Sequence, residues 1–453
     1  MKPSLLLFIL LLNCSAIFVG KAQAEEFLVG NLQITFIDPD RNNRPILTEI
    51  YYPVTESGEP APGSFPLLIF GHGFLMTWSA YENLWTHFVS HGYVMAFPRT
   101  EGGFSPNHQD FALDIAFLAS AIQVLNDDSD SPLYHTLNSR TAAMGHSMGG
   151  GAAILATSYS NHIDVYLGLA PAETNPSAIS AAQIITQPAL IISGSADDVT
   201  PESTHQIPIY EALATESRSL VSITGGGHCY FANFNFYCNL GESGTSGNIT
   251  LTREEQQQTT ADITTPWLDF FLKDNCESWD ELQDSLQNSS RITFMQNTII
   301  GKPEIILQGD TLYSTKAYSY QWFMDGEPIT GAEEAFLIPE ISGNYQVETN
   351  YFNACKWMSD ALQVEMPTSV SGLTDSDIRV YPNPASEIIF IKMPSHHVFS
   401  EVQLLSLNGA IQLNLKIKTG QDFNLNVSAL QPGYYILQFF GEGKEIVRKV
   451  MVK

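Results

Sequence analysis

The chain has 453 residues, room for two to four domains, and 44% of them are hydrophobic, enough for sizeable buried cores. Its 48 acidic residues outnumber the 21 basic ones and give a formal charge of −27. A surface of this sign repels phosphate groups, so we expect no nucleic acid and no anionic membrane as a partner.

The first residues have the pattern of an export signal. Lys2 precedes an apolar run from Leu5 to Leu12, and a small-residue cleavage site follows at Ala22-Gln23-Ala24. We therefore expect residues 1–24 to be a signal peptide that is cleaved after Ala24. No later apolar run is long enough to span a bilayer.

Four cysteines remain after that cleavage, in a compartment that permits disulfides: Cys229, Cys238, Cys276 and Cys355. They allow three complete pairings, and the sequence does not choose among them. A bond between Cys229 and Cys238 would close one short loop. Cys355 falls in a different predicted domain, where we expect that it can stay free.

Residues 25–287 alternate short apolar strands with helical segments. The expected strands are 27–37, 46–54, 65–70, 93–97, 141–144, 165–169, 189–193 and 220–223, and the clearest helices are 81–90 and 111–125. Continuous apolar strands separated by helices predict an α/β fold, with a mostly parallel sheet and helices on both of its faces.

A serine lies between a strand and a helix in this region. The apolar run Thr141 to Met144 is followed by Gly145 to Gly149, which read Gly-His-Ser-Met-Gly. A G-x-S-x-G segment at such a junction is the nucleophile elbow, where small flanking residues leave room for a strained turn. We predict Ser147 as the nucleophile. The Met148 N–H, at the start of the helix, would face the developing oxyanion.

An acid and a histidine follow this serine in the chain order of such enzymes. Asp197 and Asp198 lie just past the strand 189–193, at the edge of the sheet where Ser147 emerges. We choose Asp197 as the catalytic acid and expect Asp198 to be a solvated turn residue or a helix cap. Three glycines precede His228 and let a loop bring its ring to the serine, so His228 is the predicted general base.

The loop after the third strand is expected to supply the second oxyanion donor. Gly71 and Gly73 permit a close approach of the backbone, and the Phe74 N–H would pair with that of Met148. The Phe74 ring would also wall the acyl pocket. We expect non-catalytic roles for three further histidines, His72, His146 and His205. Of these, His146 is expected to pack beneath the elbow.

Five aromatic side chains lie between Cys229 and Cys238, directly after the predicted base. Together they could form an apolar lip for acyl chains or for a plastic. The alternative is that most of them pack inward, and from the sequence we favour that alternative.

With these residues in place, residues 25–287 resemble an α/β-hydrolase. The most similar groups are the dienelactone-hydrolase-like and cutinase-like polyesterases, which include hydrolases of poly(ethylene terephthalate). The resemblance rests on matching segments at 71–74, 145–150, 190–201, 204–205, 208–213 and 226–228. It implies a serine carboxylic-ester hydrolase that acts through an acyl-enzyme on short-chain, medium-chain or polymeric esters.

One departure from this resemblance concerns the substrate. Polyesterases usually carry an aromatic clamp after the strand that follows the elbow helix, in an A-P-x-x-P-W-like run. Here the run from Ala170 to Asn175 has Glu173 and Thr174 and no tryptophan. The departure disfavours an aromatic polyester as the substrate and leaves ester hydrolysis in place.

Residues 288–370 read as a linker followed by short alternating strands. Tyr318 to Asp325 is a strand that enters an Asp-Gly turn, and Gly343 to Glu348 is a later strand. Trp322 is the expected core residue. The segment resembles an Ig-like sandwich module of bacterial surface proteins, and we expect it to be a spacer.

Residues 375–453 form a second small all-β unit. It opens with Val380 to Ala385, contains a late strand from Gly433 to Leu437 and ends with the basic and apolar run Val447 to Lys453. These features resemble the C-terminal sorting domain of the type IX secretion system of Bacteroidota. The resemblance implies secretion to the medium or the cell surface, with the type IX machinery as a partner.

Two classes of function fit these observations. The first is a secreted serine esterase with the triad Ser147, Asp197 and His228, either cutinase-like or a lipase- or acetylhydrolase-type enzyme for small lipids. The second is a surface adhesin or binding protein with an inactive hydrolase domain. Inactive relatives typically lose a triad residue and none is missing here, so we favour the enzyme. The sequence has no metal cluster or nucleotide loop; we expect no cofactor, and a monomer.

Overall fold

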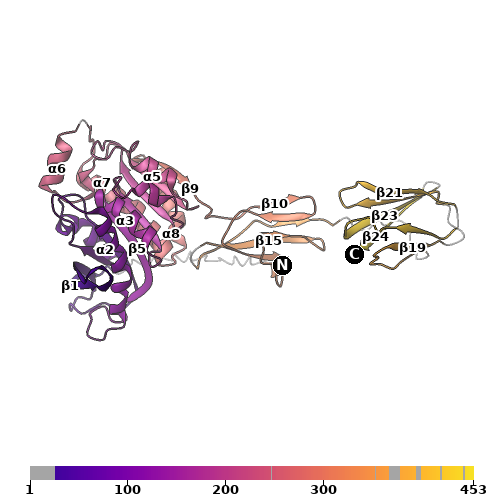
Figure 1. Cartoon of the computed structure of the whole chain (residues 1–453), viewed down its shortest axis with the longest axis horizontal. Helices are drawn as coiled ribbons and strands as arrows, with labels where there is room; N and C mark the ends of the chain where they lie inside the picture. The colour runs from indigo at the N-terminus through magenta and orange to yellow at the C-terminus, as the bar shows by residue number, and fades with distance from the viewer. Residues whose placement is uncertain are drawn as a thin grey trace, which may run out of the picture. The chain divides into compact units, whose positions relative to one another are not determined.

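The computed structural model describes residues 26–453 except 246, 352–353, 367–377, 394–398, 419–420 and 442–443. The expected signal peptide lies outside the described residues. The chain divides into two compact units, whose elements are drawn in Figure 1. The first unit runs to Gly301 and includes Asn350–Lys356, and the second comprises Lys302–Thr349 and Trp357–Lys453.

A nine-stranded sheet forms the centre of the first unit, in the order β1-β2-β4-β3-β5-β6-β7-β8-β9. The strands from β3 to β8 run parallel to one another, whereas β1, β2 and β9 pair antiparallel. The bounds are β1 (Leu28–Asp38), β2 (Arg44–Val54), β3 (Phe65–Gly71), β4 (Val94–Pro98), β5 (Leu137–His146), β6 (Val165–Leu169), β7 (Ala189–Gly194), β8 (Arg218–Ile223) and β9 (Ile292–Asn297). Every residue of β3, β4, β6 and β7 is buried, as expected for parallel strands that helices cover on both faces.

The helices pack in two groups, which confirms the predicted α/β class. Contacts join α2 to α3, α3 to α4 and α4 to α5, whereas α7 contacts α1 and α8. The bounds are α1 (Glu82–Ser90), α2 (His108–Ala121), α3 (Met148–Tyr159), α4 (Ala178–Ala182), α5 (Gln206–Ala212), α6 (Phe236–Ser243), α7 (Arg253–Leu272) and α8 (Glu277–Asn288). The helix expected at 111–125 begins earlier because the Asn107 side chain caps it, accepting from the Gln109 and Asp110 N–H groups.

The last strand of the sheet lies beyond the expected end of the hydrolase domain. β9 pairs along its whole length with β8, from Ile292 opposite Ile223 to Asn297 opposite Arg218. A boundary at residue 287 therefore cuts off an edge strand, and the compact unit extends to Gly301. The strand is hard to recognise in the sequence because only Ile292 is well buried.

Two disulfides join the four cysteines of the described chain. Cys229 bonds to Cys238, closing the short loop that the sequence allows. Cys276, at the start of α8, bonds to Cys355, which lies between β15 and β16. The expectation that Cys355 stays free is therefore wrong. It followed from assigning Cys355 to a separate domain, whereas the segment Asn350–Lys356 belongs to the first unit.

The residues after Gly301 form small antiparallel sheets, as the sequence predicts. The first group comprises β10 (Ile305–Gln308), β11 (Thr311–Ser314), β12 (Ser319–Met324), β13 (Glu327–Pro328), β14 (Phe336–Leu337), β15 (Gly343–Asn350), β16 (Lys356–Met358) and β17 (Leu362–Val364). Trp322 is fully buried at its centre with Leu312 and Tyr345, which confirms that it is a core residue. The Ig-like resemblance itself stays a prediction.

The C-terminal strands enclose a core of their own. They are β18 (Arg379–Tyr381), β19 (Ile388–Lys392), β20 (Glu401–Ser406), β21 (Ile411–Lys416), β22 (Phe423–Asn426), β23 (Gly433–Gly441) and β24 (Lys444–Val452). Inward-facing residues alternate along β23, where Tyr435, Leu437 and Phe439 are buried. In the part of the chain that the structure describes, no helix is both long and apolar enough to cross a membrane.

A chain that ends at Gly301 should be more stable than one that ends at Gln287. Both should carry Cys276→Ser, because each truncation removes Cys355. The shorter chain loses β9, which exposes the outer edge of β8 and removes the buried Ile292 side chain. We expect a free energy of unfolding lower by about 2 kcal/mol and a midpoint lower by roughly 5 °C in calorimetry. Equal midpoints would show that β9 adds nothing to this unit.

Candidate active site

Ser147 lies in a strained turn between β5 and α3. Its φ of 54° and ψ of −121° put a non-glycine residue in the positive-φ region. The turn is fixed from both sides, because the Ser147 N–H donates to Leu169 O (3.0 Å) and its carbonyl accepts from the Ala172 N–H (2.9 Å). The backbone therefore over-determines a conformation that is rare elsewhere.

Two flanking glycines make room for this turn. A Cβ on Gly145 would lie 2.3 Å from the carbonyl oxygen of Gly149. A Cβ on Gly149 would lie 2.1 Å from the carbonyl oxygen of Gly71, at the end of β3. Any side chain at either position would thus push α3 away from β3 or open the turn. The G-x-S-x-G spacing has this steric cause.

Asp197 and His228 are joined by a short hydrogen bond. Asp197 Oδ2 lies 2.7 Å from His228 Nδ1, and both residues are almost fully buried, at 4% and 3% exposure. Asp197 follows β7 and His228 follows β8, so the carboxyl ends of neighbouring parallel strands bring them together. Asp198, the next residue in the chain, is exposed.

Thr200 completes the surroundings of the carboxylate, and the sequence reasoning missed it. Its hydroxyl donates to Asp197 Oδ2 (2.9 Å) and lies 3.1 Å from His228 Nδ1. Asp197 Oδ1 accepts from the N–H groups of Val199 and Thr200, both at 2.8 Å. Burial acts to raise the pKa of Asp197, but the hydrogen bonds from His228 and Thr200 outweigh it, so the pKa is lowered and the carboxylate stays charged.

The loop with the predicted oxyanion donor is tied to the elbow through Tyr81 and His146. The Gly73 N–H donates to Tyr81 Oη (2.8 Å), which lies 3.0 Å from His146 Nδ1. His146 Nε2 lies 3.0 Å from the carbonyl oxygen of His228. Phe74 follows Gly73 directly, and Met148 is the first residue of α3, where an N–H has no partner within the helix.

The proton positions in this chain of hydrogen bonds follow from its ends. A carbonyl oxygen only accepts, so His146 Nε2 carries the hydrogen and its Nδ1 accepts from the Tyr81 hydroxyl. Burial, followed by the neighbouring His228, lowers the pKa of His146 to about 3, which keeps the ring neutral. The position of the predicted base is thereby coupled to the position of the oxyanion loop.

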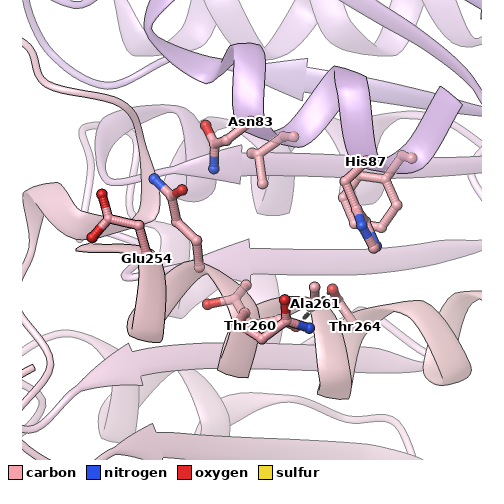
Figure 2. A pocket seen from close by; sticks show the side chains of 10 residues that line it. Asn83, His87, Glu254, Thr260, Ala261 and Thr264 are labelled. Atoms are coloured by element: carbon pink, nitrogen blue, oxygen red, sulfur yellow. Dashed lines mark hydrogen bonds between the residues drawn. The ribbon is translucent and has the colours of Figure 1, made fainter. Parts of the chain in front are cut away.

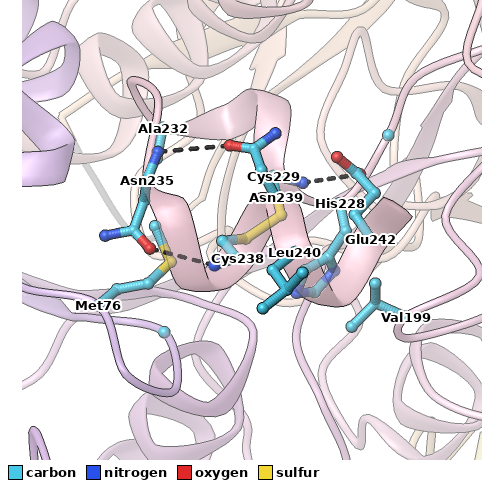
Figure 3. The surroundings of a disulfide bond; sticks show 12 residues. Met76, Val199, His228, Cys229, Ala232, Asn235, Cys238, Asn239, Leu240 and Glu242 are labelled. Carbon is cyan, nitrogen blue, oxygen red and sulfur yellow. Dashed lines mark hydrogen bonds between the residues drawn. A yellow bond between two sulfur atoms is a disulfide. The ribbon is translucent and has the colours of Figure 1, made fainter. Parts of the chain in front are cut away.

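The loop that carries His228 is held by polar residues from α6 and α7. Gln256 pairs with both backbone groups of Gly227, accepting from its N–H and donating to its carbonyl, each at 2.8 Å. Glu242 accepts from the Cys229 N–H at 3.0 Å, as Figure 3 shows beside the Cys229–Cys238 disulfide. Neither residue can be recognised from the sequence, because a lone glutamine or glutamate in a polar helix is usually exposed to solvent.

His72 and His205 both stabilise loops. Both ring nitrogens of His72 face backbone carbonyls, of Gly73 (2.9 Å) and Thr100 (2.8 Å). His205 Nδ1 accepts from the Glu173 N–H (2.9 Å), and the Glu173 carboxylate accepts from the Ile179 N–H at the start of α4. At the expected position of the clamp aromatic, Glu173 therefore makes hydrogen bonds that stabilise the loop.

Most of the aromatic side chains after His228 face solvent. Phe231 is buried, but Phe234, Phe236 and Tyr237 are between 51% and 72% exposed. The expectation that most of them pack inward is therefore wrong. The inner side of the loop is already filled by Phe231, and the disulfide and α6 turn the later residues outward.

A separate cavity of about 270 Å³ lies between α1 and α7 (Figure 2). Its polar lining includes Asn83, Glu254, Gln257, Thr260 and Thr264, and no member of the predicted triad. His87 also lines it; burial, followed by the nearby His91, lowers the pKa of this histidine to about 4. The cavity is thus distinct from the site around Ser147.

Comparisons with known proteins bear on both ends of the chain. Residues 47–246 match the family model described as PET hydrolase-like. This part of the chain is similar to that family, and we call it the PET hydrolase-like domain after the match. Residues 379–453 match the model described as a secretion system C-terminal sorting domain. The sorting domain indicates type IX secretion to the cell surface or the extracellular space, as the sequence predicts.

Individual relatives are cutinases of Thermobifida. The PET hydrolase-like domain is 28% identical over 181 residues to Cutinase 2 of Thermobifida cellulosilytica and to a cutinase of Thermobifida fusca (strain YX). Each match covers 40% of this chain. It spans 64% of the first relative and 52% of the second, so this chain covers between half and two thirds of the relatives that it matches.

Replacing Gln256 by leucine should destabilise the PET hydrolase-like domain. The change leaves the buried N–H and carbonyl of Gly227 without partners, which should lower the free energy of unfolding by about 2 kcal/mol or more. Gln258→Leu on the same helix is the matched control, because its amide only pairs with Asp262 on the exposed face, a contact worth about 0.5 kcal/mol or less. Thermal unfolding of both variants measures the difference. Equal unfolding midpoints for Gln256→Leu and Gln258→Leu would contradict the role given to Gln256.

Proposed function

We propose that the PET hydrolase-like domain is a serine carboxylic-ester hydrolase. Ser147 is the nucleophile, His228 the general base and then acid, and Asp197 the residue that orients the imidazole. The backbone N–H groups of Met148 and Phe74 hold the oxyanion. The observation that carries the proposal is the buried Asp197–His228 hydrogen bond of 2.7 Å at the sheet edge where the strained Ser147 turn lies.

The geometry supports a defined protonation sequence. The ionised Asp197 accepts a hydrogen bond from His228 Nδ1, which leaves Nε2 as the basic nitrogen for the serine hydroxyl. Attack on the ester carbonyl gives a tetrahedral intermediate, and the imidazolium returns the proton to the leaving alcohol. Water then enters with His228 again as base and releases the acid. Because Asp197 stays charged, it stabilises the imidazolium in both steps.

The substrate and partners belong to the same proposal. The cutinase relatives and the domain match support esters of short to medium acyl chains or polyesters as substrates. The sorting domain would engage the type IX secretion machinery. We propose that the enzyme works as a monomer, without a cofactor, because the proposed triad and oxyanion donors all come from one chain.

Replacing Ser147 by alanine tests the function directly. Turnover of p-nitrophenyl butyrate should fall by at least about 10³-fold, while thermal unfolding stays close to that of the wild type. A serine-directed phosphonate should label the wild type at Ser147 and leave the variant unlabelled. A folded variant with full activity would place the nucleophile elsewhere, and an inactive wild type would favour a binding protein.

The neighbouring aspartates supply a matched control for this assay. Asp197→Asn should lower turnover by about 10⁴-fold, since an amide favours the wrong tautomer of His228. Asp198→Asn makes the same chemical change at an exposed position and should have little effect. The reverse result would move the acid to Asp198.

The enzyme should release product faster from a film of poly(caprolactone) than from one of poly(ethylene terephthalate). The clamp position holds no tryptophan, and Thr174 is buried against the place where Gly151 lacks a side chain. No aromatic ring is therefore available there to stack on a terephthalate unit. Product release from both films, normalised to turnover of a soluble ester, measures the preference. Faster release from the aromatic film would contradict this account.

A further inference from the structure

A group of exposed apolar side chains lies on α6 and the loop before it. Phe234 is 72% exposed, Phe236 63%, Tyr237 51% and Leu240 59%. Phe104, in the loop after β4, is 78% exposed, and its ring centroid lies 6.5 Å from that of Tyr237. We call these five residues the aromatic surface. Water is a poor solvent for so many exposed rings, so a large patch of this kind marks an interaction site.

The aromatic surface is neutral on a strongly acidic protein. Residues 229–241 contain no Asp, Glu, Lys or Arg, whereas the whole chain carries a formal charge of −27. A partner that is recognised by its charge would not be bound by this uncharged segment. The composition fits a partner that is itself uncharged and apolar.

The loop that presents these rings is rigidly held. The Cys229–Cys238 disulfide closes it, and the Asn235 side chain caps α6 by accepting from the Cys238 N–H at 3.1 Å. The guanidinium of Arg253 donates to the carbonyls of Cys229 and Ala232 and lies over the Tyr230 ring. A rigid loop loses little conformational entropy on binding, so it binds a partner more favourably than a flexible apolar segment would.

The surface is continuous with the candidate active site. Cys229 follows His228 directly, and Figure 3 shows Leu240, Val199 and His228 around the same disulfide. Val199 is 37% exposed, and its N–H donates to Asp197. Apolar side chains thus run from the acid–base pair to the exposed face of α6. A long neutral chain bound along this line would reach the Asp197–His228 pair.

We propose that the aromatic surface is the docking surface for a water-insoluble polyester. Aromatic rings and Leu240 cover the uncharged polymer, while the site around Ser147 takes one ester bond from it. The inference rests on the proposed ester hydrolysis and extends it to adsorption on a solid. A small soluble ester would need none of the residues beyond Val199.

Adsorption can be measured without catalysis. The full chain carrying Ser147→Ala is incubated with poly(caprolactone) and poly(ethylene terephthalate) films, and bound protein is quantified against a cellulose film. Phe234→Ser, Phe236→Ser and Tyr237→Ser are then added together, and Phe104→Ser is tested separately because it comes from a different loop. We expect the triple change to weaken adsorption to both polyesters by about tenfold or more.

Val124→Ser with Tyr159→Ser is the matched control. Both residues are exposed, at 67% and 43%. They lie near the carboxyl ends of α2 and α3, helices that start at the active-site edge of the sheet and run away from it. Adsorption of this variant should equal that of Ser147→Ala alone. Circular dichroism and thermal unfolding confirm that each variant is folded.

Several results would overturn the docking surface. These are adsorption unchanged by both the triple change and Phe104→Ser, equal binding to cellulose, equally tight binding to phosphatidylcholine vesicles, or a dimer that the triple change dissociates. A different result would overturn the proposed function, namely a wild type that does not hydrolyse soluble esters. Adsorption that still depends on the aromatic surface in that case would support the docking surface alone.

Discussion

The end of β3 and the start of α3 approach each other too closely to admit a side chain between them. The Gly149 Cα lies against the carbonyls of Gly71 and His72 with no space for a side chain. This contact fixes the distance between the turn that carries Ser147 and the loop that carries Phe74. An oxyanion hole is useful only when its donors are placed before the charge develops. In the proposed site, steric exclusion would achieve this placement.

The proposed acid–base pair, Asp197 and His228, is positioned by a different kind of interaction. His228 sits on a glycine-rich loop with little side-chain packing of its own, and buried polar groups hold it. Gln256 binds the backbone one residue before it, Glu242 the backbone one residue after it, and His146 its own carbonyl. These residues come from α7, α6 and the elbow. The position of His228 therefore depends on helices that lie late in the chain as well as on the strands of the sheet.

Much of this arrangement can be predicted from local patterns. The elbow, the order serine, acid, histidine, and the parallel sheet each have a short signature, because each depends on the chemistry of adjacent residues. The choice of Asp197 over Asp198 agrees with the contacts, although its catalytic role stays a proposal. Tyr81 and Gln256 were not predicted, because their partners His146 and Gly227 lie far away in sequence. Thr200 was not predicted although Asp197 lies only three residues away, because threonine is common on surfaces.

Two other differences have the same origin. The strand β9 belongs to the sheet only through its pairing with β8, and its own residues are mostly exposed. The outward aromatic side chains of the loop after His228 depend on how much of its inner side Phe231 already fills. Which face of a short segment is buried depends on the residues that pack against it. These residues are distant in sequence, so local sequence patterns do not reveal them.

The bond between Cys276 and Cys355 turns the intervening polypeptide into a covalent ring. A protease that cuts the chain once inside this ring, for example in the turn after Met324, opens the ring but separates nothing. The proposed catalytic residues would stay covalently attached to the C-terminal end of the chain. For a protein that is secreted to the cell surface or the extracellular space, one disulfide thus gives the residues between Cys276 and Cys355 tolerance to a single break.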